Sequence, residues 1–261
     1  MQRNLVLGLT VLAFMIAGLG ATAVAEDEPA EGEVNEGLVL AEKVKKANEE
    51  KDSTEISGLC EDIITFAKSA KTAAEVDPVA VELVRSLKVA KGNWGTLRKI
   101  IAALGELRSK PGSKALKKLA FQKKPKDENY EELQATALIA ISLMRDPKLI
   151  EKIADQMKSR SIPVAKAAMA GFKNYSPAPG KTRKKVAEVI MKRMQAEKPS
   201  AGQGGGVSAE AQKRWQVVSP VIVETMQAIC RQPTISDVDN WDEWWRENKK
   251  KRSVWKDPPK E

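Results

Sequence analysis

Runs of lysine and arginine are the clearest chemical feature of this sequence. From Arg108 to Lys126 the chain has eight cations and no acid, and further cations cluster over 181–193 and 249–252. Such patches attract polyanions, although a run of lysines is also typical of a solvated helix face. The candidate anion- or partner-binding residues are Arg98, Arg108, Lys110, Lys114, Lys117, Lys118, Lys181, Arg183, Lys184 and Lys185.

The sequence offers little for acid–base or nucleophilic catalysis. It contains no histidine, which removes His-based triads, most zinc sites and the commonest general base near neutral pH. Ser253 and Lys256 have Ser-x-x-Lys spacing, but they lie in a polar segment beyond the last predicted helix. We therefore expect a protein that is not an enzyme, with no catalytic residue, cofactor, metal or small-molecule substrate.

A group of acidic residues near the C-terminus could suggest a calcium-binding loop. It comprises Asp237, Asp239, Asp242 and Glu243. The spacing does not fit, because no glycine stands at loop position six and Asn248 takes the place of the closing glutamate. Asp237 and Asp239 suit the N-cap and first turn of a helix instead.

Three tryptophans lie on that helix at positions 241, 244 and 245. Their spacing puts them on one stripe, where they could form an aromatic platform for a sugar or a partner. Packing as an apolar cap explains the same pattern more simply. The cysteines, Cys60 and Cys230, also sit among apolar residues at helical spacing. We expect both to be buried, although a disulfide is possible in an exported protein.

The elements that would position these residues are helices. Aromatic residues make up only 5% of the chain, and no long segment alternates apolar and polar residues as a half-buried strand does. Small apolar residues at spacings of three and four predict closely packed helices. The glycine run at 202–206 follows no predicted strand and lacks the Gly-Lys-Ser/Thr ending of a phosphate-binding loop.

Residues 1–25 have the three parts of an export signal. Arg3 precedes an uncharged apolar run from Leu5 to Leu19, and Ala23-Val24-Ala25 fits a cleavage site before Glu26. We expect cleavage between Ala25 and Glu26 and a periplasmic or secreted protein; the alternative is an uncleaved N-terminal anchor. The acidic stretch at 26–37 predicts a disordered lead-in.

From about residue 38 a helical pattern repeats. When the segments beginning at Thr96, Leu133 and Val164 are aligned, large apolar residues coincide at the ninth position: Leu104, Ile141 and Phe172. With outer copies at Ile64 and Met226, the spacing is typical of two-helix solenoid repeats, except for a long last step that contains the glycine run.

A turn with proline or glycine separates the two helices of each copy. The turns are Lys110-Pro111-Gly112, Asp146-Pro147 and Pro177–Gly180, and Asp77-Pro78 starts the second helix of the first copy. Proline fits the first turn of a helix, and Asp146 is a candidate N-cap.

The repeated pattern resembles the HEAT-repeat family, especially the short HEAT-like repeats of exported bacterial proteins. The resemblance rests on Leu97-Arg98, Ala103–Leu107 and Met144–Pro147, with a Trp-rich closing helix after Ile229. It implies an all-α solenoid of about four to five helix pairs, stacked with a right-handed sense and closed by that helix.

The expected organisation is a signal peptide (1–25), a lead-in (26–37), a repeat domain (38–249) with a flexible insertion at 198–207, and a polar tail (250–261). The leading hypothesis is an exported scaffold that binds a protein partner through its helical surface. The alternative is a binder of anionic polymers or anionic membrane surfaces. Export argues against an intracellular nucleic acid as partner.

Overall fold

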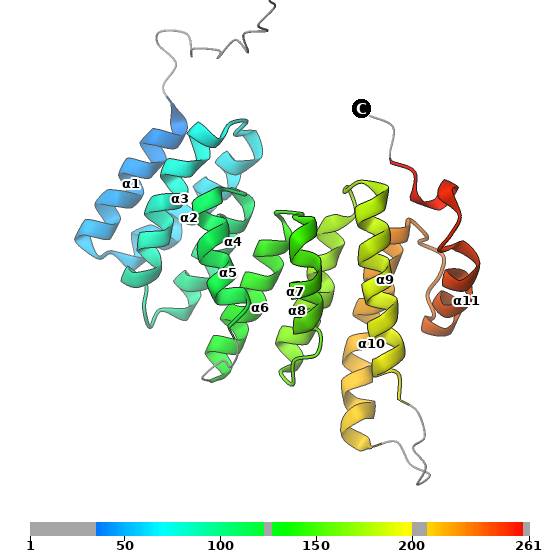
Figure 1. The fold of residues 1–261 in the computed structure, drawn as a ribbon. Helices are drawn as coiled ribbons and strands as arrows, with labels where there is room; N and C mark the ends of the chain where they lie inside the picture. The colour runs from blue at the N-terminus through cyan, green and yellow to red at the C-terminus, as the bar shows by residue number, and fades with distance from the viewer. Residues whose placement is uncertain (1–34, 123–126, 200–207, 258–261) are drawn as a thin grey trace, which may run out of the picture. The chain divides into compact units, whose positions relative to one another are not determined.

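The computed structural model describes residues 35–122, 127–199 and 208–257, and all regular secondary structure in these ranges is helical (Figure 1). The all-α prediction is therefore confirmed. Four predicted segments lie outside the described residues: the signal peptide, the lead-in up to residue 34, residues 200–207 of the insertion and residues 258–261 of the tail.

The α-helices are α1 (Glu36–Glu50), α2 (Ser53–Ser69), α3 (Ala73–Val89), α4 (Trp94–Glu106), α5 (Lys110–Ala120), α6 (Glu128–Ser142), α7 (Ile150–Gln156), α8 (Ile162–Gly171), α9 (Gly180–Glu197), α10 (Ala209–Cys230) and α11 (Val238–Asn248). Short 3₁₀ helices are η1 (Pro147–Leu149), η2 (Phe172–Tyr175) and η3 (Arg252–Trp255).

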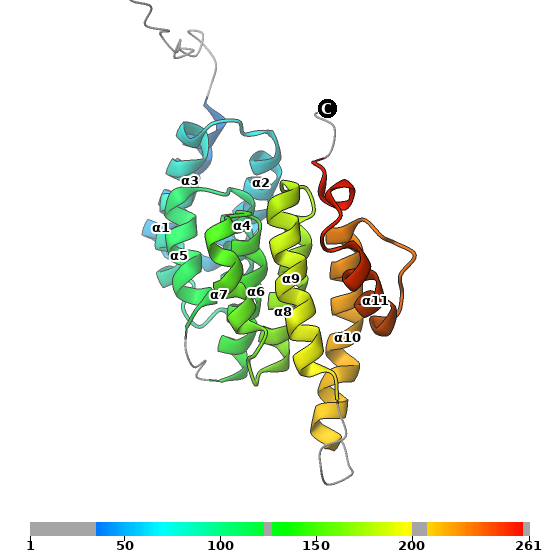
Figure 2. The ribbon, with the colours of Figure 1, turned by 45° about the vertical axis from the view of Figure 1, so that its right-hand side comes forward.

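Most helices pack against the helix two places along the chain. One series of contacting neighbours is α2, α4, α6, α8 and α10, and a second is α1, α3 and α5. Contacts of α2 with α3, α4 with α5 and α5 with α6 join the two series, and α9 packs against α7 and α10. Figures 1 and 2 show the labelled helices following one another in chain order.

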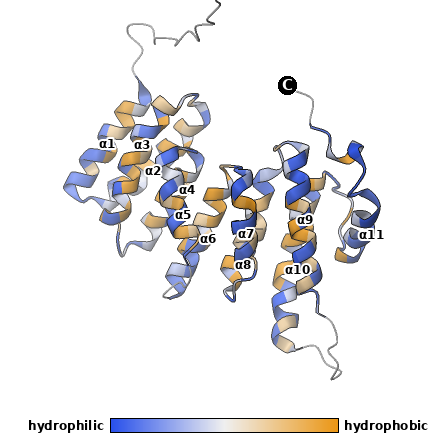
Figure 3. Cartoon of the chain, in the orientation of Figure 1, coloured by the Kyte–Doolittle hydropathy of each residue, from blue (hydrophilic) through white to orange (hydrophobic). Residues whose placement is uncertain are grey.

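The apolar residues at the ninth position of the repeat lie in the core. Leu104, Ile141 and Phe172 are completely buried, as the sequence predicts. Each helix carries both hydrophobic and hydrophilic residues (Figure 3), and one cluster of buried side chains continues from Leu40 in α1 to Trp245 in α11. Burial of one such side chain stabilises the fold by about 1.5–3 kcal/mol.

The prediction that a helix begins at Asp77-Pro78 is wrong. α3 begins four residues earlier, because Thr72 and Glu75 form a capping box: Thr72 Oγ1 accepts a hydrogen bond from the Glu75 N–H, and the Glu75 carboxylate accepts from the Lys71 N–H and the Thr72 hydroxyl. Pro78 therefore lies inside the helix, where it removes one backbone donor.

The residues Lys110-Pro111-Gly112 also differ from their predicted role as a turn. They form the first turn of α5, which Ser109 caps by accepting a hydrogen bond from the Gly112 N–H. The turn itself is made at Arg108, whose φ is 47°. Asp146 caps η1 as predicted, and the residue before it, Arg145, has a φ of 51°.

The predicted polar tail is partly built into the fold. Trp255 in η3 packs edge-on against Trp244 and Trp245 of α11, at ring-centroid distances of 6.4 and 6.1 Å. Trp241 is completely buried and Trp245 is 8% exposed, so these two tryptophans of the stripe pack into the core. No periodic pattern indicates that Trp255 packs on the fold, because a single tryptophan in a charged segment forms no apolar stripe.

Glycines allow alternate helices to approach closely. A Cβ placed on Gly105 of α4 would lie 2.8 Å from both Cα and Cβ of Ala140 in α6. A Cβ on Gly171 at the end of α8 would lie 3.1 Å from the Ser142 hydroxyl of α6. The distance between these helices is therefore set by positions that have no room for a larger side chain.

We predict that Gly105→Ala destabilises the protein by about 1–3 kcal/mol, because the added methyl group forces α4 and α6 apart. Gly58→Ala is the matched control: Gly58 also lies within a helix, but a Cβ there meets nothing within 4 Å. The control should stabilise by about 0.4–1 kcal/mol. Chemical denaturation of the two variants measures the difference; equal stabilities would contradict the close approach.

Candidate functional site

Five predicted anion-binding residues lie together on α5 and in the turn before it. All five are exposed and none forms an ion pair among the described residues: Arg108, Lys110, Lys114, Lys117 and Lys118. The opposite face of α5 buries Leu116 and Ala120, so helical periodicity turns the lysines outward. The rest of this basic run, residues 123–126, lies outside the described residues.

The start of this basic face borders a groove of about 750 Å³. There Arg108 and Lys110 share the lining with Lys68 and Lys71, which come from the end of α2 and the turn after it. No sequence pattern links these two lysines to the basic run, because about 40 residues separate them from Arg108. The packing of α2 against α4 brings the two turns side by side.

The remaining predicted cations do not join this face. Arg98 on α4 pairs with Glu132 of α6, and Lys185 on α9 pairs with Glu151 of α7 at 3.3 Å. Lys181 is exposed and Lys184 is half-buried on α9. Cations that are close together in the sequence therefore lie on several different surfaces of the folded chain.

Arg183 is a structural residue rather than an exposed anion-binding one, so its prediction as a binding residue is wrong. Its side chain is completely buried and donates hydrogen bonds to the backbone oxygens of Ile229, at 2.9 Å, and Lys256, at 2.7 Å. Burial lowers the pKa of the guanidinium, and the nearby Arg231 adds to this. Arg183 thus fastens the C-terminal segment to α9 and α10.

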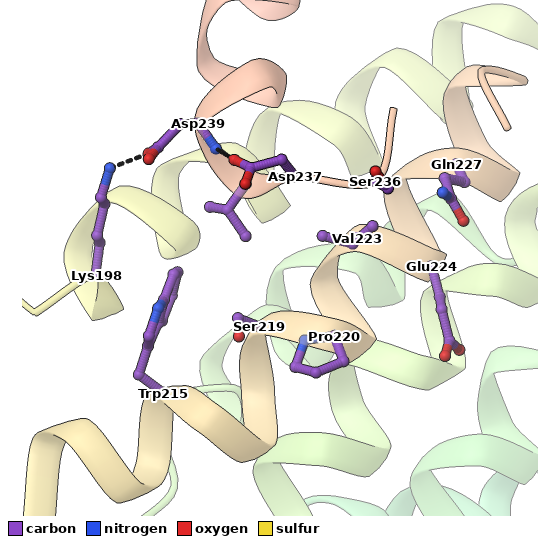
Figure 4. A pocket seen from close by; sticks show the side chains of 11 residues that line it. Lys198, Trp215, Ser219, Pro220, Val223, Glu224, Gln227, Ser236, Asp237 and Asp239 are labelled. Carbon is purple, nitrogen blue, oxygen red and sulfur yellow. Dashed lines mark hydrogen bonds and ion pairs between the residues drawn. The ribbon is translucent and has the colours of Figure 1, made fainter. Parts of the chain in front are cut away.

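The cleft in Figure 4 lies between α10 and the start of α11, beside the end of α9, and has a volume of about 540 Å³. Trp215, Pro220 and Val223 give it an apolar side along α10. No sequence motif marks this cleft, because its residues come from α9, α10 and the connection to α11.

Carboxylates outnumber cations in the cleft. Glu224, Asp237 and Asp239 line it together with one cation, Lys198. The hydrogen bond and charge of Lys173, outside the lining, lower the pKa of Glu224, and the Asp239 carboxylate raises the pKa of Lys198. Glu224 pairs with Lys173 and Asp239 pairs with Lys198. Counted by formal charge, three carboxylates and one cation give the lining an excess of two negative charges, on a chain whose formal charge is +9.

Asp237 has a structural role in this cleft. It caps α11 by accepting a hydrogen bond of 2.6 Å from the Asp239 N–H, which confirms the predicted N-cap. Within the described ranges, no group of three or more His, Cys, Asp and Glu side chains is arranged to hold a metal ion.

The cysteines are buried, as predicted, and both are free, so they form no disulfide with each other. Burial raises the pKa of Cys60 and of Cys230 to about 12, so neither thiol forms a reactive thiolate near neutral pH. No helix in the described part of the chain is both long and apolar enough to cross a lipid bilayer.

Comparisons with known proteins give no family. No family model and no curated protein matches the chain. The crystal structure of an engineered protein from the Northeast Structural Genomics Consortium is similar to it at 17% sequence identity and a TM-score of 0.40, over 85% of this chain and 98% of the other.

We predict that Arg183→Met releases the C-terminal segment. The variant leaves the carbonyls of Ile229 and Lys256 without their charged donor, at a cost of about 1.5–3 kcal/mol for each hydrogen bond. Hydrogen exchange should accelerate in residues 252–257, and the fluorescence of Trp255 should shift toward that of a solvated indole. Lys181→Met, an exposed position on the same helix, is the control and should leave both signals unchanged.

Proposed function

We propose that this chain is an exported, non-enzymatic interaction module built as a HEAT-like α-solenoid. In this interpretation the helix pairs are α2/α3, α4/α5, α6/α7, α8/α9 and α10/α11, with α1 covering the first pair. The contacts between alternate helices and the phase of Leu104, Ile141 and Phe172 support the interpretation. Export rests on the sequence of residues 1–25 alone.

The proposal that the module binds a protein partner rests on the cleft of Figure 4. Trp215 is only partly buried, and it lines the cleft together with Pro220 and Val223 of α10. Tryptophan contributes strongly to protein interfaces when a partner completes its burial.

The charge of the cleft indicates the kind of partner. Net negative charge beside an exposed indole face suits a segment that bears lysine or arginine, which can pair with the carboxylates and lie over the Trp215 ring. The occupant we propose is therefore an extended, cationic segment of another exported protein.

Trp215→Ala should abolish capture of such a partner, because truncation of a central interface tryptophan costs about 2 kcal/mol or more of binding free energy. The purified chain and the variant are immobilised and exposed to envelope extract, and the retained proteins are quantified by mass spectrometry. Isothermal titration with a synthetic cationic segment of the retained protein then measures affinity.

Val217→Ala is the matched control, since Val217 is an exposed apolar residue of α10 outside the cleft. The proposal requires a partner that Val217→Ala retains and Trp215→Ala loses. Identical retention by both variants, or no specific retention by the unmodified chain, contradicts it.

Polyanion binding is a second candidate function, and the face of α5 favours it. Its exposed lysines form no ion pair among the described residues. The adjoining groove has four cations, Lys68, Lys71, Arg108 and Lys110, against the two carboxylates of Asp77 and Glu106. Binding there would release counterions and weaken steeply with added salt.

The double substitution Lys117→Glu and Lys118→Glu should weaken binding to heparin or to anionic vesicles by about tenfold or more in low salt and reduce the salt dependence. Lys45→Glu with Lys46→Glu on α1 makes the same charge change in a helix whose lysines already pair with Glu42 and Glu50. Equal losses in the two double variants would show that net charge, not the α5 face, attracts the polyanion.

A further inference from the structure

A second cavity, of about 480 Å³, lies where the turn between α7 and α8 meets the end of α9 and the start of α10. None of its lining residues also lines the cleft of Figure 4. The cavity is lined by Lys158, Ser159, Arg160, Ile162, Arg193, Glu197, Glu210, Lys213 and Arg214.

Arg214 builds the wall of this cavity. Its Nε and Nη2 donate to the two oxygens of Glu197 at 2.9 and 3.1 Å, a bidentate pair between α10 and α9. Its Nη1 and Nη2 also donate to the backbone oxygens of Ser159, at 2.8 Å, and Met157, at 3.0 Å. All three nitrogens of Arg214 therefore have partners, and the residue is fixed in place.

Arg193 donates to the same Glu197 carboxylate, and some of its N–H groups have no acceptor among the described residues. Its Nη2 donates to Glu197, whose two oxygens then serve two guanidinium groups. The Nε–H of Arg193 is buried and has no acceptor among the described residues. The Arg193 side chain is 20% exposed, and its Nη1 group makes no hydrogen bond among the described residues, so the guanidinium can donate to an anion in the cavity.

The cavity has an excess of positive charge. Five cations and two carboxylates line it, which leaves three positive charges uncompensated. Lys158 pairs at 3.1 Å with Asp155, but both side chains are more than 60% exposed, so this pair neutralises the cavity little. Arg160 and Lys213 are exposed and form no ion pair among the described residues.

We propose that this cavity binds a phosphate group, with Arg193 as its central donor and Lys213 and Arg160 at its rim. A phosphate ester carries close to two negative charges at neutral pH and several acceptor oxygens, which suits an excess of three cations better than a single carboxylate does. Arg193 and Arg214 are held rigid by Glu197, so their donors are ordered before the ligand arrives.

The phosphate could belong to a soluble ester or to a phospholipid headgroup, and the test separates them. Isothermal titration of the full chain with glycerol phosphate measures the soluble ester, and co-sedimentation with phosphatidylcholine vesicles that contain phosphatidic acid measures the headgroup. Acetate is the control for a carboxylate. Binding of the ester, with or without vesicle binding, supports the site. Vesicle binding without ester binding supports it only if Arg193→Gln and Lys213→Gln both weaken that binding, and contradicts it otherwise.

Arg193→Gln should weaken phosphate binding by about 10- to 100-fold, the loss of a charge-assisted hydrogen bond. Lys213→Gln is the second variant, because this exposed side chain can change without disturbing the core; it should weaken binding several-fold. Lys192→Gln removes one charge from the neighbouring residue of α9, which does not line the cavity, and should bind as the unmodified chain does.

The proposal is overturned if neither ligand form binds, if acetate binds as tightly as phosphate, or if Arg193→Gln and Lys213→Gln bind like Lys192→Gln. These outcomes are independent of the proposed protein partner, because Trp215→Ala leaves the phosphate cavity intact.

Discussion

The close approach of alternate helices at small residues fixes the geometry of the rest of the molecule. Gly105 against Ala140, and Gly171 against Ser142, leave no space for larger side chains between α4, α6 and α8. At this spacing Arg98 of α4 reaches Glu132 of α6, and the turns at the helix ends come within electrostatic range of each other. Burial lowers the pKa of Arg145, and Arg108 in the neighbouring turn lowers it further. Binding surfaces formed by successive turns depend on this helix spacing.

The periodic part of the fold could be predicted from the sequence, because burial on one helix face repeats every three or four residues. Leu104, Ile141 and Phe172 were placed in the core by that criterion, and they are buried. Helix ends depend on single residues, and two signals competed at the start of α3. The proline at 78 suggested a start there, whereas the capping box of Thr72 and Glu75 determines it.

The binding residues were harder to predict, since a linear run of cations does not show which members face solvent. Arg183 and Lys184 are neighbours of similar charge, yet one is buried and the other half-exposed. Helical spacing does indicate the burial of Arg183, because this residue lies three and four positions before the buried Val186 and Ala187 and therefore shares their helix face. Residues 193 and 214 come from different helices, and only the packing of α9 against α10 brings them to one carboxylate.

The residues that line each surface set its local charge, so different surfaces of this protein can bind different partners. At 0.1 M ionic strength, interactions between exposed charges are largely screened beyond about 10 Å. The net charge of +9 therefore does not decide what the cleft beside Trp215 attracts, because the carboxylates at 224, 237 and 239 lie in its own lining. The lining of the phosphate cavity contains an excess of cations, and its carboxylate Glu197 already pairs with the guanidinium groups of Arg193 and Arg214. A cationic segment and a phosphate therefore each meet an excess of opposite charge in the lining of their own site.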